Sequence, residues 1–124
     1  MIDFTNGKAI KLSKSKKPTH INTIQPLLIG GEEVLEEYSG MRDFVIFTNK
    51  RLIAVNVQGL TGSKKDFTSL PYSKIQAFSV ETAGTFDLDA ELELYFSGLG
   101  KVKFEFSGSS DITKIGQFIG EQIL

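Results

Sequence analysis

The chain has 124 residues, the length of a single domain, with 40% hydrophobic and 23% charged residues, an ordinary globular composition. It has no cysteine and one histidine, which excludes disulfides, thiolate metal sites, cysteine nucleophiles and zinc sites built from several histidines. No apolar run approaches the roughly 18 residues of a membrane span, and the first 20 residues lack the apolar segment of a secretion signal, so we expect a cytoplasmic protein.

Charge is distributed unevenly along the chain, although its net value is only −1. Residues 1–17 hold five lysines and one aspartate, whereas the rest holds nine basic and fourteen acidic residues. An acidic body argues against a nucleic-acid partner, which requires a basic patch. We therefore expect a frayed, solvated basic arm over residues 1–18, with contact to anionic lipid or nucleic acid as the alternative, before a folded domain over residues 19–124. The lysines of the arm are Lys8, Lys11, Lys14, Lys16 and Lys17.

A short helix is predicted first, over residues 19–29. Thr19 is a suitable N-cap, Pro26 shortens or kinks the helix, and Gly30-Gly31 ends it. Its apolar residues recur at helical spacing and are Ile21, Ile24, Leu27 and Leu28.

Seven strands follow the helix. The second and third are apolar on both faces and are joined by Asn49-Lys50, a two-residue hairpin signal. Their second face needs a cover, for which the 19–29 helix and a neighbouring subunit are the two alternatives. The predicted strands cover residues 33–39, 42–48, 51–57, 64–70, 75–82, 86–96 and 101–107.

The sixth predicted strand has the clearest pattern, FDLDAELELYF, from Phe86 to Phe96. Apolar residues alternate with mostly charged ones, which predicts a long antiparallel strand with one buried and one wet face. Its acidic row consists of Asp87, Asp89, Glu91 and Glu93. Alternate residues on a strand lie about 6.5–7 Å apart, too far for two neighbours to share one ion unaided, so we interpret the row as a solvated face and not a metal or catalytic site.

The last hairpin is constrained by the side-chain alternation of its two strands. Pairing Leu94 with Val102 and Glu93 with Lys103 keeps apolar residues on one face and opposite charges together, and predicts a five-residue loop or a bulge around residues 97–100. Ser110-Asp111 then caps an amphipathic helix that extends to the C-terminus. The predicted fold is mainly β: a seven-stranded antiparallel barrel or sandwich with a C-terminal α-helix and a short N-terminal helix.

Four segments of the chain resemble the bacterial pleckstrin-homology (PH) domain family over roughly residues 19–124. They are FTNKRL (residues 47–52), QGLTG (58–62), LPYSKI (70–75) and SVETAGTFDLDAEL (79–92). The resemblance implies a PH-like fold with two nearly orthogonal sheets and a helix that caps one end. It also implies self-assembly, with five-fold rings as the expected form, and no defined biochemical role.

Basic residues outside the arm offer two candidate anion sites. The loop at residues 39–42 holds one cation, Arg42, whereas a phosphoinositide headgroup needs several, so we do not expect specific phosphoinositide binding. The segment GLTGSKK lacks the spacing of a phosphate-binding loop. Lys64 and Lys65 are left as a small candidate anion patch.

The turn Asn49-Lys50-Arg51 is a further candidate, with two alternative roles. Its cations either serve solubility and protect a sheet edge, or pair with the acidic face of a neighbouring copy in a head-to-tail contact that closes into a ring. That partner surface comprises Thr85, Phe86, Asp87, Asp89 and Glu91.

The function predicted from these observations is that of a non-enzymatic scaffold or protein-interaction module. Its expected partners are copies of itself, in a homo-oligomer such as a pentamer, and an unidentified protein. The alternative is a peripheral membrane module that binds anionic lipid through the basic arm. We assign no catalytic residue, cofactor or metal site.

Overall fold

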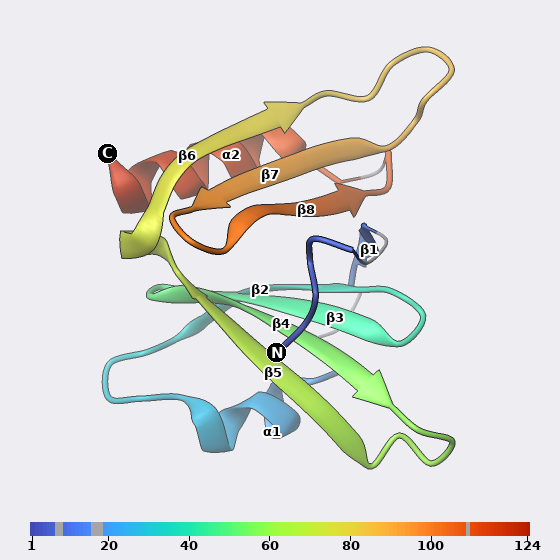
Figure 1. Ribbon diagram of the computed structural model, residues 1–124, viewed down its shortest axis with the longest axis vertical. Coiled ribbons are helices and arrows are strands. Elements are labelled where there is room, and N and C mark those ends of the chain that lie inside the picture. Colours follow the sequence, from blue (N-terminus) through green and yellow to red (C-terminus); the bar gives the residue numbers. More distant parts are fainter. Residues whose placement is uncertain (7–8, 16–18, 109) are drawn as a thin grey trace.

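The computed structural model describes residues 1–6, 9–15, 19–108 and 110–124, arranged as two layers of strands with a helix against each (Figure 1). The lower layer contains β2 to β5 and the upper one β6 to β8. The elements are β1 (Ile10–Lys14), α1 (Ile21–Ile24), the 3-10 turn η1 (Gln25–Leu27), β2 (Val34–Ser39), β3 (Asp43–Thr48), β4 (Arg51–Gln58), β5 (Lys64–Pro71), the 3-10 turn η2 (Tyr72–Lys74), β6 (Ile75–Glu81), β7 (Ala90–Phe96), β8 (Gly100–Phe106) and α2 (Ile112–Ile123).

The strands form one sheet in the order β5-β4-β3-β2-β1-β8-β7-β6. Neighbours are antiparallel except β1 and β8, which are parallel. The main core lies between the layers and includes Phe47, Phe104 and Phe106, all buried. The predicted fold, mainly β with a C-terminal helix and a short N-terminal one, is confirmed, and β1 is an eighth strand that joins the layers.

The basic arm is not frayed where β1 forms, which corrects the prediction. Ile10 and Leu12 are buried and lie opposite Phe104 and Phe106 of β8, while Lys14 pairs with Tyr38 of β2. The alternation of IKLSK gives this segment one apolar face, a signal that the lysine count obscured. Lys8, Lys16 and Lys17 lie outside the described residues.

The strand predicted from Phe86 to Phe96 begins only at Ala90, because its partners end there. The β6–β7 ladder starts at Glu81 opposite Glu91, and the β7–β8 ladder ends at Ala90 opposite Phe106. The alternating residues 86–89 therefore pair with no neighbouring strand and do not face the core. They form a loop, residues 84–89, in which Phe86 is 99% exposed, and its predicted place on the buried face is wrong.

The register of the last hairpin is confirmed, with Leu94 opposite Val102 and Glu93 opposite Lys103. The loop is shorter than the predicted five residues, because Phe96 pairs with Gly100 and leaves three residues between them. Gly98 and Gly100 have φ angles of 83° and 92°, which side-chain-bearing residues rarely adopt, and these angles allow the tighter turn.

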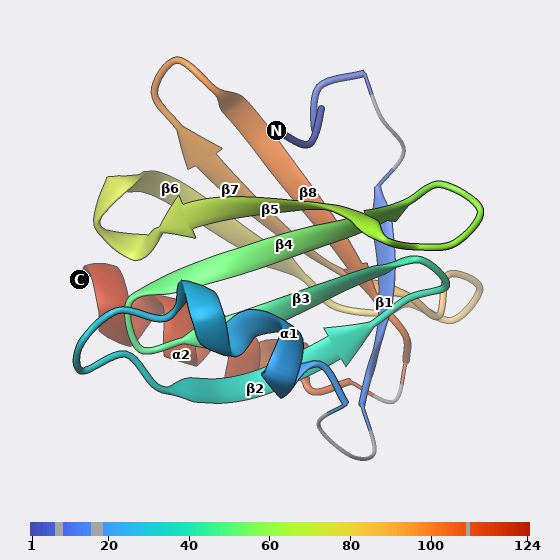
Figure 2. The same cartoon turned by 90° about the horizontal axis from the view of Figure 1, so that it is seen from below.

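The second face of β3 and β4 is covered from within the chain by the α1 segment (Figure 2). Ile24 packs in a second core, so the helix and not a neighbouring subunit is the cover. Thr19 is not the N-cap of α1: His20 holds that position, and the Thr19 hydroxyl donates to Glu37 at 3.3 Å. The second core consists of Ile24, Phe44, Ile46, Ile53 and Val55.

Helix α2 begins as predicted, with the Asp111 carboxylate accepting a hydrogen bond from the Lys114 N–H at 3.1 Å. It packs against β6 and β7. Gly116 permits close approach there, since a Cβ at this position would lie 2.8 Å from Cγ1 of Val80.

Candidate functional site

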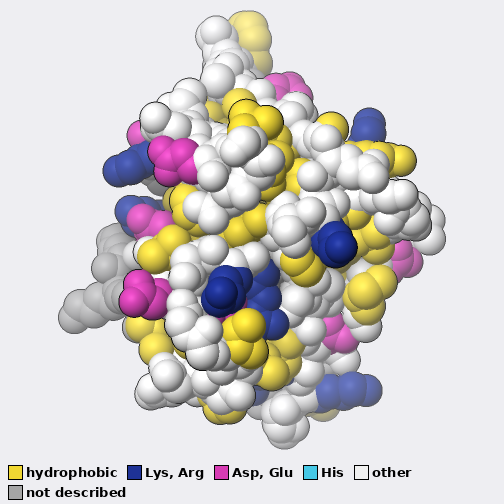
Figure 3. Space-filling view, turned by 90° about the vertical axis from the view of Figure 1, so that its left-hand side faces the viewer, with side chains coloured by type: hydrophobic (Ala, Val, Ile, Leu, Met, Phe, Trp, Pro, Cys, Tyr) yellow, Lys and Arg dark blue, Asp and Glu magenta, His cyan; other side chains and the backbone are white. Residues whose placement is uncertain are grey.

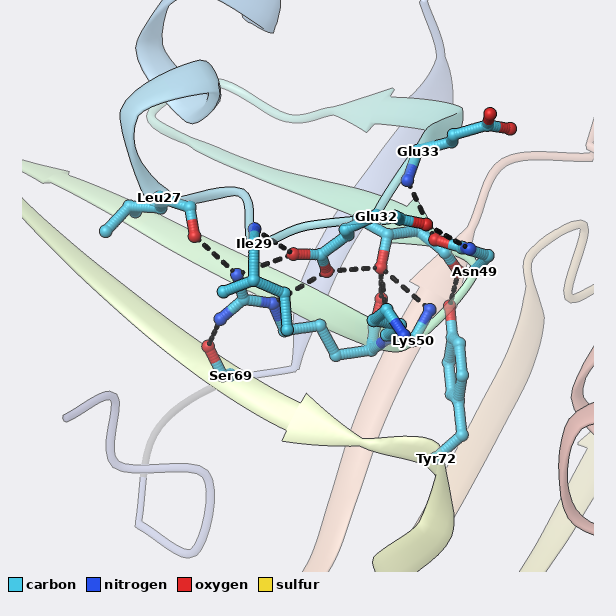
Figure 4. Close-up of polar contacts among 11 residues, drawn as sticks. Leu27, Ile29, Glu32, Glu33, Asn49, Lys50, Ser69 and Tyr72 are labelled. Carbon is cyan, nitrogen blue, oxygen red and sulfur yellow. Dashed lines mark hydrogen bonds and ion pairs between the residues drawn. The ribbon is translucent and has the colours of Figure 1, made fainter.

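The β3–β4 turn nominated from the sequence is the centre of an internal polar cluster (Figure 4). The guanidinium of Arg51 donates to both carboxylate oxygens of Glu32, each at 2.9 Å. It also donates to the Leu27 carbonyl and to the Ser69 hydroxyl, each at 2.8 Å. Arg51 thus ties the chain before β2 to the sheet, and we call this group the Glu32–Arg51 cluster.

Glu32 is the acid at the centre of the cluster, and its side chain is fully buried. Burial alone raises the pKa of a carboxyl group, but hydrogen bonds from Arg51, Thr48 and the Ile29 N–H, together with the charge of Arg51, lower the pKa of Glu32 to about 2. The carboxylate is therefore ionised at neutral pH and paired with the Arg51 guanidinium. A buried, bidentate pair of this kind is a structural contact, because its polar atoms are already hydrogen-bonded and are not free to bind a ligand.

The neighbouring turn residue Asn49 extends the same contact. Its side chain accepts from the Glu33 N–H at 2.8 Å and donates to the Gly31 carbonyl at 2.9 Å. Below it, the Tyr72 hydroxyl donates to the Thr48 carbonyl at 2.8 Å, and burial raises the pKa of Tyr72. Of the three nominated turn residues, Asn49 and Arg51 thus bond within the chain, and Lys50 is exposed.

In the acidic row predicted from the sequence, Glu91 and Glu93 are paired within the chain. Glu91 lies 3.1 Å from Lys103, and Glu93 lies 4.0 Å from Lys101. The salt bridges are diagonal between β7 and β8, and they make this face a solvated, charge-paired surface. Within the described residues, no three metal-ligating side chains come together.

The remaining nominated residues lie in the 84–89 loop. The Asp87 carboxylate accepts from the Asp89 N–H at 3.1 Å, and the Asp87 carbonyl accepts from the Gly84 N–H at 2.6 Å. Thr85 and Phe86 occupy the tip between these bonds. The structure therefore places Thr85, Phe86, Asp87 and Asp89 together in one internally bonded loop, whereas Glu91 belongs to β7.

The base of this loop is held by packing as well. A Cβ at Gly108 would lie 2.8 Å from the Leu88 carbonyl oxygen, so only glycine allows the loop to rest on the chain between β8 and α2. Leu88 itself is 66% exposed, and Val80 of the adjacent strand β6 is also exposed. Phe86 and Leu88 thus face solvent on a loop that hydrogen bonds and packing hold in place.

A pocket of about 340 Å³ lies between β2 and α2, and no pattern in the sequence predicted it. Tyr38, Phe47 and Phe118 form its aromatic lining: Phe47 meets the other two rings edge-on at centroid distances of 5.8 and 6.0 Å. Lys14 and Lys114 lie at the pocket, as do Glu36 and Asp111. Burial, then the charges of Glu36 and Asp111, raise the pKa of Tyr38 to about 12, so its hydroxyl is neutral and able to donate.

Figure 3 views the side of the molecule on which α2 ends. Hydrophobic side chains are exposed there between separate acidic and basic ones, and the described residues show no broad patch of one charge on this face. The candidate anion patch at the start of β5 is small: Lys64 and Lys65 are both exposed, and the Lys65 ammonium donates to the Gly62 carbonyl at 2.9 Å. In the same region Arg42 donates to the Gly59 carbonyl. Anion binding at Lys64 and Lys65 stays a prediction.

The fold and the surfaces described above define a small β-barrel-like domain with a capping C-terminal helix. The sequence profile of the family described as bacterial PH domain matches residues 3–123. The chain belongs to this family, and the resemblance noted in the sequence is confirmed.

Relatives and solved structures agree with this assignment. The chain is 53% identical over 97 residues to the uncharacterized protein YjqA of Bacillus subtilis (strain 168), covering 78% of this chain and 75% of that one. It is 30% identical over 99 residues to the uncharacterized protein YozO of the same organism, covering 80% and 85%. Their names assign no activity.

Two crystal structures from Shewanella have closely similar folds. A DUF1696 family protein with a pleckstrin-homology domain from Shewanella loihica PV-4 has a TM-score of 0.79 and 36% identity, covering 94% of this chain and all of that one. A pleckstrin homology domain from Shewanella amazonensis SB2B has a TM-score of 0.68 and 39% identity, covering 95% and 94%. Across the described residues, no helix is both long enough and apolar enough to cross a membrane.

Proposed function

We propose that this PH domain is a non-enzymatic interaction module that assembles with copies of itself, in a closed ring, and presents a repeated surface to a protein partner. The observation that carries the proposal is the exposure of two large apolar side chains, Phe86 and Leu88, on a hydrogen-bonded loop. Large apolar side chains on an ordered support are typical of contact residues.

The energetic reason is the hydrophobic effect. Burying a Phe or Leu side chain contributes about 1.5–3 kcal/mol relative to leaving it in water, and Phe86 and Leu88 gain little of this within the chain. A ring would repeat one weak partner site several times and raise the avidity for a multivalent partner. Pairing of Glu91 and Glu93 with lysines supports a binding role over carboxylate catalysis.

Light scattering of the purified chain over a concentration series tests the proposal. We expect a defined mass equal to several subunits of 13.7 kDa, maintained on dilution through the micromolar range. A mass of 13.7 kDa at every concentration would reject self-assembly. Raised ionic strength is the control, because an apolar contact survives salt whereas an assembly held by exposed ion pairs weakens.

Lipid binding through the N-terminal segment stays a prediction, but fewer of its residues are available to contact lipid. Ile2 and Phe4 pack against the main core and Ile10 is part of it, so they do not form an apolar face for lipid. Lys11 and Lys14 are paired with Glu105 and Glu36. Flotation with anionic vesicles, with and without lysines 8, 16 and 17 changed to Ser, tests lipid binding by these three lysines. Absence of lysine-dependent binding would reject the lipid-binding prediction.

A further inference from the structure

We propose that β6 binds an extended peptide segment of a partner protein as the next strand of the sheet, and that basic side chains of this segment lie over the outer face. The outer face is the side of β6, β7, β8 and β1 that is turned away from the main core. The inference deepens the proposed function, because it assigns the surface that receives the protein partner. It does not depend on self-assembly, since each copy carries its own β6.

The free edge of β6 is the first observation. β6 is an end strand of the sheet, so within the described residues one of its sides has no neighbouring strand (Figure 1). Its ladder with β7 is irregular between Ile75 and Ala77 and regular from Ala77 to Glu81. Alternate residues of an edge strand direct their N–H and C=O groups away from the sheet. The regular part of β6 therefore offers backbone donors and acceptors to an incoming strand.

The opposite end strand, β5, is protected in a way that β6 is not. β5 begins with Lys64-Lys65 and ends at Pro71. The Ile2 N–H also donates to the Thr68 hydroxyl oxygen at 3.0 Å, which places the N-terminal segment against β5. Lysine, proline and a covering segment all discourage the addition of a strand. β6 contains no lysine, arginine or proline, and five of its seven residues are exposed, so this end of the sheet stays open.

The inner side of β6 is suited to the apolar side chains of an added strand. Val80 points from this side toward Gly116 of α2. Phe78 points in the same way toward Gly120. Because β6 ends the sheet, Val80 remains 37% exposed and Phe78 is only half-buried. A strand beside β6 would cover both with apolar residues of its own, through cross-strand contacts.

The outer face has one carboxylate more than it has cations. Three ion pairs lie within it, and each joins a lysine to a glutamate: Lys11–Glu105, Lys101–Glu93 and Lys103–Glu91. Glu81, at the edge, has no cation among the described ion pairs and lies directly opposite Glu91. Like charges in directly opposite positions destabilise a strand pair. A lysine or arginine of the added strand beside Glu81 would supply the missing cation.

A hollow of about 280 Å³ on the outer face favours a second basic side chain. Ala77 and Ser79 of β6 leave room there because their side chains are small. Tyr95, which is 43% exposed, offers an aromatic surface for the aliphatic part of a lysine or arginine. Glu93 also lines the hollow, and its contact with Lys101 is long, at 4.0 Å, so a closer cation could share this carboxylate.

These observations together select a peptide as the occupant. A strand edge binds an extended chain through main-chain hydrogen bonds, and hollows for alternate side chains give the specificity. The surplus carboxylate at the edge favours a basic segment, whereas it would repel a nucleic acid or an anionic membrane. The expected partner sequence alternates apolar residues, which face Phe78 and Val80, with basic residues, which face Glu81 and Glu93.

The test begins with a phage-displayed library of random peptides about ten residues long, selected on the full chain. We expect the selected peptides to alternate apolar and basic residues. Synthetic copies of one selected peptide, each N-methylated at a single position, are then titrated by fluorescence anisotropy. N-methylation should weaken binding at least about tenfold at every second position and little between, because only alternate N–H groups face β6. Failure to select a peptide, or N-methyl effects without this period of two, would reject strand addition.

The charge assignment is tested by reversing it on both sides. Glu81→Lys should weaken binding of the basic peptide about fivefold, and a peptide with glutamate in place of the facing basic residue should restore it. Glu33→Lys is the matched control, because Glu33 is also exposed but precedes β2 in the other layer. Circular dichroism should show both variants folded. Equal peptide affinities of the two variants would overturn the assignment of the basic residues.

Hydrogen exchange of the β6 amides, followed by NMR, separates this inference from the proposed self-assembly. In the chain alone the outward amides should exchange freely, and peptide should protect them. If they are protected without peptide and no peptide binds, a second copy occupies the edge: the inference fails while self-assembly stands. Peptide binding with the period of two by a chain of 13.7 kDa would support the inference and reject self-assembly.

Discussion

The Glu32–Arg51 cluster and the 84–89 loop contrast in how completely their side chains are satisfied within the chain. In the cluster, a buried carboxylate and a guanidinium satisfy each other and bond to the surrounding backbone. In the loop, the polar groups of Asp87 stabilise the turn, but Phe86 at its tip is exposed to solvent. Both regions carry charges in the sequence, yet only the loop retains a large unsatisfied surface.

This contrast changes how an interface should be sought in this family member. Two of the charges that suggested complementary faces of neighbouring copies are neutralised within one chain: Arg51 by Glu32, and Glu91 by Lys103. Of the apolar residues that alternation assigned to the buried face, Phe86 and Leu88 are left exposed, whereas the four from Ala90 to Phe96 are buried. The structure thus moves the candidate contact from ion pairs to the hydrophobic loop.

The largest expected effect is on stability, from breaking the cluster. Arg51→Ala leaves the buried Glu32 carboxylate without its partner and should lower the free energy of unfolding by about 3–5 kcal/mol. Chemical denaturation measures the loss. Lys50→Ala, at the exposed neighbouring residue, is the control and should change stability by less than about 0.5 kcal/mol. Similar values for the two variants would show that the cluster is not a stability element.

The pH dependence of stability should come from the same carboxylate. The pKa of Glu32 is about 2 when folded against an ordinary 4.5, so its stabilisation is complete above pH 4.5 and lost as pH falls toward 2. The loss amounts to about 3 kcal/mol. Denaturation curves between pH 2 and 6 for wild type and Glu32→Gln should converge at the acid end. Parallel curves would contradict this assignment.

The seating of α2 should give opposite results at its two glycines. Gly120→Ala places a Cβ 3.8 Å from Phe78 and should stabilise by up to about 1 kcal/mol through helix propensity. Gly116→Ala meets Val80 at 2.8 Å, and this overpacking should outweigh the same gain, for a net loss of about 1 kcal/mol. Thermal unfolding measures both, and Val80→Ala should relieve the loss. Equal gains at both glycines would mean that the helix shifts freely.

The smallest expected effect on stability is at the loop. Phe86→Ser should change the free energy of unfolding by less than about 0.5 kcal/mol when measured at a dilution that favours monomers, because the ring makes almost no contact within the chain. A loss above 1 kcal/mol in the monomer would mean that Phe86 is a core residue after all.

The sequence predicted the parts of the fold that depend on local patterns. Alternation gave the register of Leu94 with Val102, and Ser110-Asp111 marked the start of α2. Alternation failed at Phe86 because a pattern shows which faces a strand would have, not whether a partner strand extends alongside it. The same pattern was present at Ile10 and Leu12 but was outweighed by the surrounding lysines.

The candidate sites were less predictable, because burial and long-range contacts decide them. Glu32 follows two glycines and resembles any exposed loop acid, and only the folded chain brings Arg51 to it. The pocket is lined by residues as far apart in the sequence as Lys14 and Phe118. Asn49 was correctly identified as a turn residue, but its bonds to Gly31 and Glu33 cross between segments that no local pattern relates.

The most direct test of the account is the native mass of wild type and Phe86→Ser, measured side by side by light scattering over a concentration series. We expect wild type to give a defined multiple of 13.7 kDa and Phe86→Ser to give 13.7 kDa in the same range. Equal masses for the two proteins, whether monomeric or assembled, would contradict the claim that this PH domain assembles through the exposed ring of its 84–89 loop.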